Sequence, residues 1–361
     1  VFILAVIVSS YVTNRGNTDM SADMGGATLP RISFMTEGYE VNSLPGYKSD
    51  MTLTSMRDTL TPVTNNQLDM NIAKYDNQIQ KVYWQVYTLN GKKCIQEGTI
   101  KDVQDTVTLN FRNTKILKEE RILKVTLYLD NQNIYFYTRI KNSADCNYKA
   151  SLDFANNFHS AALEGQGDKI ESYLETDTDS DADSSTYQEV TLASTQAQVL
   201  WGSLAPQVSG NVYWEIKECN ENYTSLVLKY QVKCAGDTDY ADRLYSVKEF
   251  FRIRTGEDAQ QYLLDYDRTM NQRFDGKTTA LNQKGVLVGI APTELEYETN
   301  TDGTIVAFIE DNQLWHYDKK EDEMSLVFGF ADAENMDVRT LCDLHDIRLI
   351  SVDEKGNTTF T

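Results

Sequence analysis

The stretch Val82-Tyr-Trp-Gln-Val-Tyr-Thr-Leu89, followed by Asn90-Gly91, decides the fold class. Its aromatic and β-branched residues favour an extended strand, and Asn-Gly is the strongest short signal for a hairpin turn. Further alternating strand patterns lie at 106–111, 123–129 and 134–140. Several short strands with no helical period between them predict a β-sandwich over residues 31–142.

Trp84 falls in the middle of the quoted strand. An immunoglobulin-like sandwich places its core tryptophan at such a position, so the predicted sandwich resembles that architecture. The resemblance is architectural only, because the paired cysteines of true immunoglobulin domains are missing.

The hydrophobic period changes after residue 142. Phe154, Phe158 and Ala162 are spaced four apart and Gly165 follows, which predicts an amphipathic helix over 149–164. A second short helix is predicted at 169–174. Two hairpins are expected after it, made of 212–218 with 225–232 and of 247–254 with 261–269. Helices followed by antiparallel hairpins predict an α+β domain over 143–290.

Residues 1–12, Val-Phe-Ile-Leu-Ala-Val-Ile-Val-Ser-Ser-Tyr-Val, are almost wholly apolar. A bilayer core needs roughly 20 such residues in a helix, so we interpret this run as a truncated transmembrane helix. A signal peptide and a buried core strand are the alternatives. Residues 13–30 are then a polar linker, and the bulk of the chain would lie on the extracytoplasmic side of the cell membrane.

The last segment, 291–361, predicts short antiparallel strands at 304–309, 313–317, 324–328, 346–352 and 357–360. Ile305 and Ile347 are 42 residues apart, which is typical of propeller blades. With Leu314, Trp315, Tyr317 and Asp318, the segment resembles TolB-like and WD40-like β-propeller repeats. The resemblance implies partial blades of a truncated propeller, so the fold class is mainly β and multidomain.

The composition restricts the partners. The chain contains 34 Lys and Arg residues and 54 Asp and Glu residues, which gives a net charge of −20. Such a surface repels phosphate backbones, so nucleic acid is not an expected partner. The five cysteines form no CxxC pair. Cys219 and Cys234 flank a predicted hairpin whose geometry would hold them roughly 30 Å apart, too far for a disulfide.

Acidic and histidine residues supply the candidate metal and catalytic groups. Asp177, Asp179, Asp181 and Asp183 alternate like the start of a calcium loop, but Ala182 and Gln188 stand where such a loop needs Gly and Glu. A solvated acidic loop is the favoured interpretation. His159 and His316 are expected to be structural. His345 stands beside Asp346 and near Cys342, and it is a weak binding candidate.

Aromatic residues of the sandwich supply the candidate binding surface. Tyr83, Tyr87, Tyr128, Tyr135 and Tyr137 could form a strip that stacks on sugars, although outward tyrosines are also ordinary strand formers. No G-x-S-x-G, HExxH, P-loop or dinucleotide motif occurs. We therefore predict no catalytic residue and no cofactor.

The whole chain resembles uncharacterised membrane-anchored extracytoplasmic proteins of gut Firmicutes, a group with no assigned activity to carry over. Our leading hypothesis is a membrane-anchored binding or scaffold protein of the bacterial cell surface that contacts another protein or an envelope polysaccharide. Two alternatives stay open. The chain could hold accessory modules of a hydrolase whose active site lies elsewhere, or it could be a membrane-bound regulator that senses the envelope.

Overall fold

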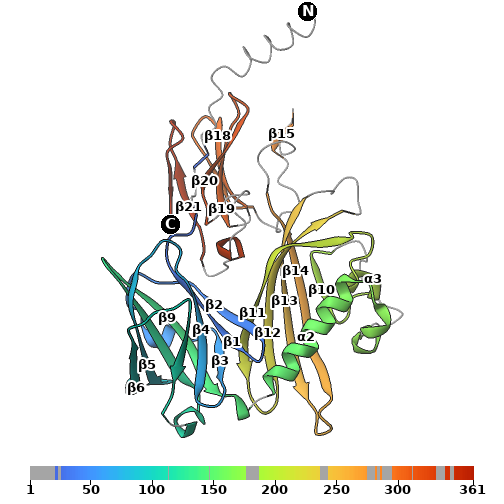
Figure 1. Cartoon of the computed structure of the whole chain (residues 1–361). Helices are drawn as coiled ribbons and strands as arrows, with labels where there is room; N and C mark the ends of the chain where they lie inside the picture. Colours follow the sequence, from blue (N-terminus) through green and yellow to red (C-terminus); the bar gives the residue numbers. More distant parts are fainter. Residues whose placement is uncertain are drawn as a thin grey trace, which may run out of the picture. The chain divides into compact units, whose positions relative to one another are not determined.

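The chain is mainly β and contains several sheets (Figure 1). The computed structural model describes residues 21–22, 26–112, 114–145, 147–175, 187–235, 243–274, 281–282, 285–286, 295–310, 312–330, 338–341 and 345–361. The chain divides into two compact units. One comprises 27–271, and the other comprises 1–26 with 272–361.

The first half of the 27–271 unit is a β-sandwich. Its strands are β1 (Arg31–Thr36), β2 (Tyr39–Leu44), β3 (Leu60–Val63), β4 (Gln67–Ala73), β5 (Ile79–Thr88), β6 (Cys94–Ile100), β7 (Thr106–Asn110), β8 (Arg121–Leu129) and β9 (Asn133–Asn142). One layer has the order β2-β1-β4-β7 and the other the order β3-β9-β8-β5-β6. Single-turn 3₁₀ helices lie at Leu53–Ser55, Thr114–Leu117 and Ser143–Asp145.

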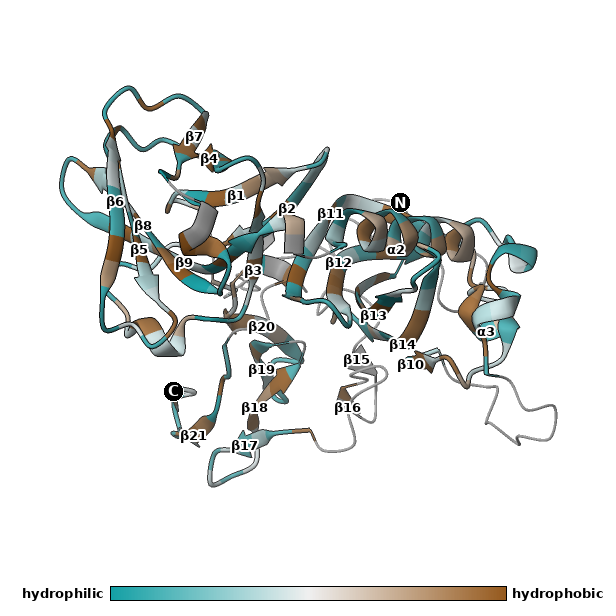
Figure 2. Cartoon of the chain, turned by 90° about the horizontal axis from the view of Figure 1, so that it is seen from below, coloured by the Kyte–Doolittle hydropathy of each residue, from teal (hydrophilic) through white to brown (hydrophobic). Residues whose placement is uncertain are grey.

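The sandwich core follows from the alternation that the sequence predicted. Along β4 every second residue is buried, and Figure 2 shows hydrophobic and hydrophilic positions mixed along the strands of both layers. Trp84 is only 4 % exposed and packs edge-on against Phe111, with 5.2 Å between ring centroids. Gly98 lies opposite Trp84 on β6 and leaves the space that the indole fills.

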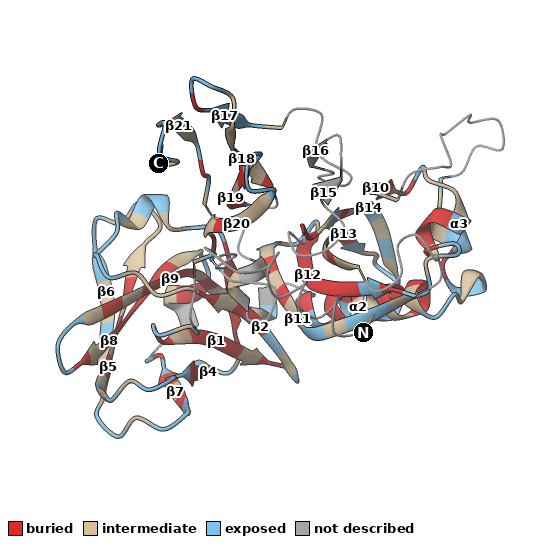
Figure 3. Ribbon diagram, turned by 90° about the horizontal axis from the view of Figure 1, so that it is seen from above, coloured by how far each residue is buried: buried red, intermediate tan, exposed pale blue. Residues whose placement is uncertain are grey.

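The second half of the unit packs a helix on an antiparallel sheet. Its elements are α2 (Tyr148–Leu163), β10 (Glu189–Thr191), α3 (Gln196–Val199), β11 (Pro206–Cys219), β12 (Thr224–Cys234), β13 (Leu244–Thr255) and β14 (Gln261–Gln272). The buried residues of α2 recur at intervals of three and four, as an amphipathic helix requires. Figure 3 shows β12 buried over most of its length.

A buried polar cluster joins α2 to this sheet. His159 Nδ1 lies 2.9 Å from Glu249 Oε1, and the Tyr230 hydroxyl donates to the same carboxylate. Burial alone would raise the pKa of Glu249, but attraction to His159 and Arg268 and the bonds from His159 and Tyr230 hold this pKa below its ordinary value. Glu249 is thus the residue that holds His159 in the structural role expected for it.

The sheet of the second half continues into the sandwich, in the strand order β10-β14-β13-β12-β11-β2-β1-β4-β7. The joint is a parallel pairing of Trp214 on β11 with Val41 on β2. Asn42, next to it, lies in a bulge of β2 with φ of +52° and is only 1 % exposed. Its amide donates to Leu60 O at 2.9 Å, and its carbonyl accepts from Ile216 N at 2.8 Å. The nine-stranded sheet therefore combines strands from both sides of the domain boundary predicted at residue 142.

The other unit contains short antiparallel strands. These are β15 (Leu281–Asn282), β16 (Gly285–Val286), β17 (Tyr297–Thr299), β18 (Ile305–Glu310), β19 (Gln313–Asp318), β20 (Glu323–Phe328), β21 (Leu349–Val352) and β22 (Thr358–Phe360), with a 3₁₀ turn at Val338–Leu341. Strands β17 to β20 form a four-stranded meander, and β21 pairs with β22. Within the described ranges these strands close no propeller ring.

Two predicted features of the N-terminal and helical regions need correction. No helix in the part of the chain that is described is long and apolar enough to cross a membrane, which contradicts the predicted single span. Residues 1–12, where that span was placed, lie outside the described residues. The predicted membrane location depended on this span and is therefore not supported either. The helix predicted at 169–174 is instead two 3₁₀ turns, Gly167–Lys169 and Glu171–Tyr173.

Substitution of Gly98 by Ala should destabilise the sandwich. A Cβ at this position would lie 2.5 Å from the Trp84 ring, which is packed and cannot retreat freely. Such overpacking costs about 1–3 kcal/mol of the free energy of unfolding, measurable by urea denaturation. Gly26→Ala is the matched control because no atom lies within 4 Å of its Cβ position. Equal stability of the two variants would contradict this packing.

Substitution of Asn42 by Ala should cost more, about 2–4 kcal/mol, because it removes the hydrogen bonds of the buried Leu60 carbonyl and Ile216 N–H to this side chain. Asn65→Ala controls for backbone strain, since Asn65 has the same φ of +52° but is exposed. Thermal unfolding should show a large loss for Asn42→Ala and a small one for Asn65→Ala. Similar losses would mean that strain alone, not the amide's hydrogen bonds, holds the joint.

Candidate functional site

The five predicted tyrosines share the outer face of the five-stranded layer. Tyr83 on β5 pairs with Thr126 on β8, which pairs with Tyr135 on β9. Because residues two apart on a strand point to the same side, Tyr87, Tyr128 and Tyr137 lie on this face too. We call it the tyrosine face.

A segment that we call the strap, residues 47–58, crosses this face. Tyr47 exchanges two backbone hydrogen bonds of 2.9 Å with Tyr135. Asp50 then accepts from Lys124 Nζ at 2.5 Å and from the Tyr137 hydroxyl at 2.8 Å. At the far end Arg57 donates to Leu89 O at 3.4 Å.

The strap and two lysines decide which tyrosines are accessible. Tyr137 is only 5 % exposed, because the strap covers it. The ammonium of Lys81 lies 4.0 Å from the ring centroid of Tyr128, and that of Lys124 lies 5.0 Å from that of Tyr135. Tyr83 and Tyr87 are half-buried, with no cation described over their rings. The two tyrosines of β5 are therefore the partly exposed members of the predicted strip that have no described cation over their rings.

An open cleft of about 560 Å³ lies at the end of the tyrosine face. Its lining residues are Arg57, Asp58, Leu89, Glu120, Arg139, Lys217 and Glu218. Leu89 comes two residues after Tyr87, and Arg139 comes two residues after Tyr137 in β9, so the face runs directly into the cleft. The strap supplies one wall and β11 another.

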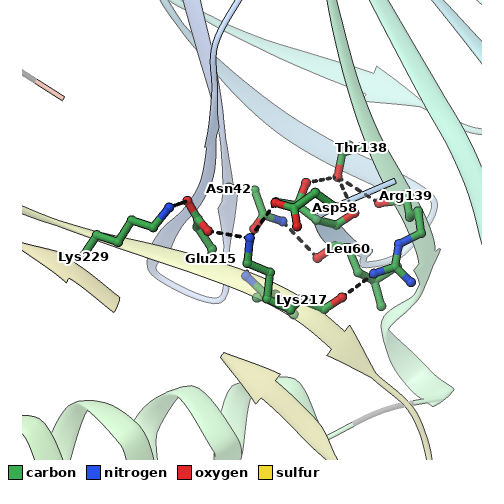
Figure 4. A network of polar contacts seen from close by, with 10 residues as sticks. Asn42, Asp58, Leu60, Thr138, Arg139, Glu215, Lys217 and Lys229 are labelled. Atoms are coloured by element: carbon green, nitrogen blue, oxygen red, sulfur yellow. Dashed lines mark hydrogen bonds and ion pairs between the residues drawn. The ribbon is translucent and has the colours of Figure 1, made fainter. Parts of the chain in front are cut away.

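Ion pairs and backbone bonds fix the cleft (Figure 4). Arg139 donates to Glu120 Oε2 at 2.8 Å and to the carbonyl of Lys217. The ammonium of Lys217 in turn lies 2.5 Å from Asp58 Oδ2 and 2.7 Å from Glu215 Oε2. The three cations and three carboxylates that line the cleft leave it with no net formal charge.

Sequence reasoning did not find the cleft. Arg139 could have been placed on the face, because it continues the alternation of Tyr135 and Tyr137. Lys217 and Glu218 could not, because their position depends on the pairing of β11 with β2, two strands far apart in the chain.

The other predicted site residues that the structure describes form no cluster. Asp177, Asp179, Asp181 and Asp183 lie outside the described residues, as does Cys342. The His345 ring packs on Phe330, with 3.9 Å between centroids. His316 Nε2 hydrogen-bonds the Thr358 hydroxyl, and burial lowers the pKa of His316. Among the described residues, no three His, Cys, Asp or Glu side chains lie together as a metal site requires.

Cys219 and Cys234 form no disulfide, as predicted. Cys219 pairs with Thr224 beside the turn and Cys234 with Pro206 at the opposite end of the hairpin.

No protein-family model, curated protein or solved structure matches the chain. The geometry of the tyrosine face and the cleft is thus the basis for a functional proposal.

Removal of the Asp50 charge should loosen the strap in a pH-dependent way. Partial burial raises the pKa of Asp50, but hydrogen bonds from Lys124 and Tyr137 bring it below its ordinary value. A lowered folded-state pKa stabilises the protein above the unfolded pKa of about 3.9, and this contribution is lost as the pH falls through the folded pKa. Asp50→Asn should therefore lower the thermal midpoint at pH 7, with a difference that shrinks below about pH 4.

The exposed Asp76 provides the control, since Asp76→Asn removes the same charge away from the strap. A thermal midpoint difference for Asp50→Asn that is constant from pH 7 to about pH 2 would contradict the pairing with Lys124.

Proposed function

We propose that the protein is a non-catalytic binding protein that holds a neutral polysaccharide along the tyrosine face and in the cleft. The observation that carries the proposal is the continuity of the two: accessible aromatic rings lead into a polar cleft of zero net formal charge.

The cleft suits a ligand with many hydroxyl groups. A hydroxyl both donates and accepts hydrogen bonds, and the cleft offers cationic donors such as Arg57 beside carboxylate acceptors such as Glu120. A strongly charged ligand would be attracted by one set and repelled by the other. The net charge of −20 further disfavours an anionic polymer.

The two β5 tyrosines supply the aromatic part of the site. Tyr83 is held by a hydrogen bond from its hydroxyl to Glu97, and Tyr87 lies next to the cleft. A ring held in place offers apolar area at little entropic cost. Sugar rings stacked on Tyr83 and Tyr87 would place the neighbouring unit of the polymer at the cleft.

The strand orders support two finer assignments as part of this proposal. A layer β6-β5-β8-β9 with β3 parallel to β9, packed on β1-β4-β7 around Trp84, is consistent with an immunoglobulin-like sandwich. The meander β17–β20 followed by the β21–β22 hairpin is consistent with propeller blades. On this proposal both are display modules, and neither carries catalytic chemistry.

Affinity gel electrophoresis with soluble neutral polysaccharides (xylan, β-glucan, galactomannan and α-glucan) tests the proposal. At least one should retard the full chain. Tyr87→Ala and Tyr83→Ala should each weaken that binding about fivefold, because an aromatic contact contributes about 1 kcal/mol. Tyr87→Phe should bind like the unmodified protein.

Two variants separate the site from the rest of the surface. Arg57→Ala removes a cleft donor whose single weak bond to Leu89 O makes it dispensable for folding, and it should also weaken binding. Tyr262→Ala, an exposed tyrosine on β14 (37 % exposed), should change nothing. If no polysaccharide is retarded, or if Tyr262→Ala weakens binding as much as Tyr87→Ala, the proposal is wrong.

A further inference from the structure

A groove of about 500 Å³ lies along α2, in the other half of the 27–271 unit. Its sides are the C-terminal part of α2 and the 3₁₀ turns at Gly167–Lys169 and Glu171–Tyr173. Gly165, with φ of +69°, ends the helix and lets Gln166 N donate to Ala161 O, which turns the chain back along α2. The groove does not involve the tyrosine face.

The groove has an aromatic wall. Phe154 and Tyr173 meet edge to face, with 5.1 Å between centroids and perpendicular planes. Phe158 forms the buried floor, 6.3 Å from Tyr173. A volume of this size with aromatic walls and a few polar groups falls within the range of small-ligand sites.

The polar groups of the groove include one cation, Lys169, one carboxylate, Glu164, and the side-chain amides of Asn157 and Gln166. Lys169, exposed at the rim, has no ion pair or side-chain hydrogen bond among the described residues, and the same holds for the side chain of Asn157. Glu164, the carboxylate that lines the groove, accepts from Gln166 Nε2 at 2.6 Å and keeps its negative charge, whereas no described carboxylate pairs with Lys169. The groove therefore offers one cation without an ion-pair partner, beside an edge-to-face pair of aromatic rings.

We propose that this groove binds a small aromatic carboxylate. The ligand ring would lie against Phe154 and Tyr173, where aromatic pairs favour offset or edge-on contact. Its carboxylate would pair with the Lys169 ammonium, a charge-assisted bond that an uncharged analogue cannot form. Asn157 would supply a further donor at the rim.

Ligand-observed NMR titration of the full chain with phenylacetate, and with phenylacetamide as the uncharged analogue, tests the proposal. Phenylacetate should bind more tightly than phenylacetamide. Lys169→Met should weaken phenylacetate binding about fivefold, the upper range for an exposed ion pair, and leave phenylacetamide unchanged. Phe154→Ala should weaken both ligands.

Lys149→Met is the control, because Lys149 lies at the start of α2, pairs with Asp153 and does not line the groove. Circular dichroism melting verifies that each variant is folded. The proposal is overturned if phenylacetate does not bind, if both ligands bind equally, or if Lys169→Met and Lys149→Met behave alike. Polysaccharide retardation should be normal in Lys169→Met, so the two proposals fail separately.

Discussion

The side-chain amide of Asn42 in β2 bonds to two other strands at once, and the geometry of the larger unit depends on it. Its donors reach Leu60 O and the Thr61 hydroxyl on β3, and its acceptor receives Ile216 N of β11. The bulge in β2, with Asn42 in the left-handed region, turns this side chain toward both neighbours. Asparagine tolerates that conformation better than most residues, so backbone shape and hydrogen bonding select the same residue.

The shape of the candidate polysaccharide site depends on this joint between β2 and β11. β11 is held against the sandwich, and this brings Lys217 to Asp58 of the strap and lets its carbonyl accept from Arg139 of β9. Without that contact the tyrosine face would end in open solvent at Leu89. The groove along α2 has a different origin, since the left-handed Gly165 creates it within a single stretch of the chain.

Local sequence signals predicted the local structure well. The strand at 82–89, the helix at 149–164 and the hairpin after residue 212 all occur within a few residues of their expected bounds. The alternation also placed all five tyrosines on one face. It could not show which tyrosines are covered, because the strap over Tyr137 and the lysine over Tyr128 come from distant segments. The joint of β2 to β11 depends on one residue pair, Val41 with Trp214, which no periodicity encodes.

That single pair also has a mechanical consequence. The antiparallel ladders on either side, such as β11 with β12, are long and share load over many bonds. Between β2 and β11 the ladder is reduced to the pair at Trp214 and Val41, supported by the Asn42 amide. A tension applied between residues 27 and 271 would therefore load the sheet most at this joint, where the hydrophobic core that the two halves share would have to resist it.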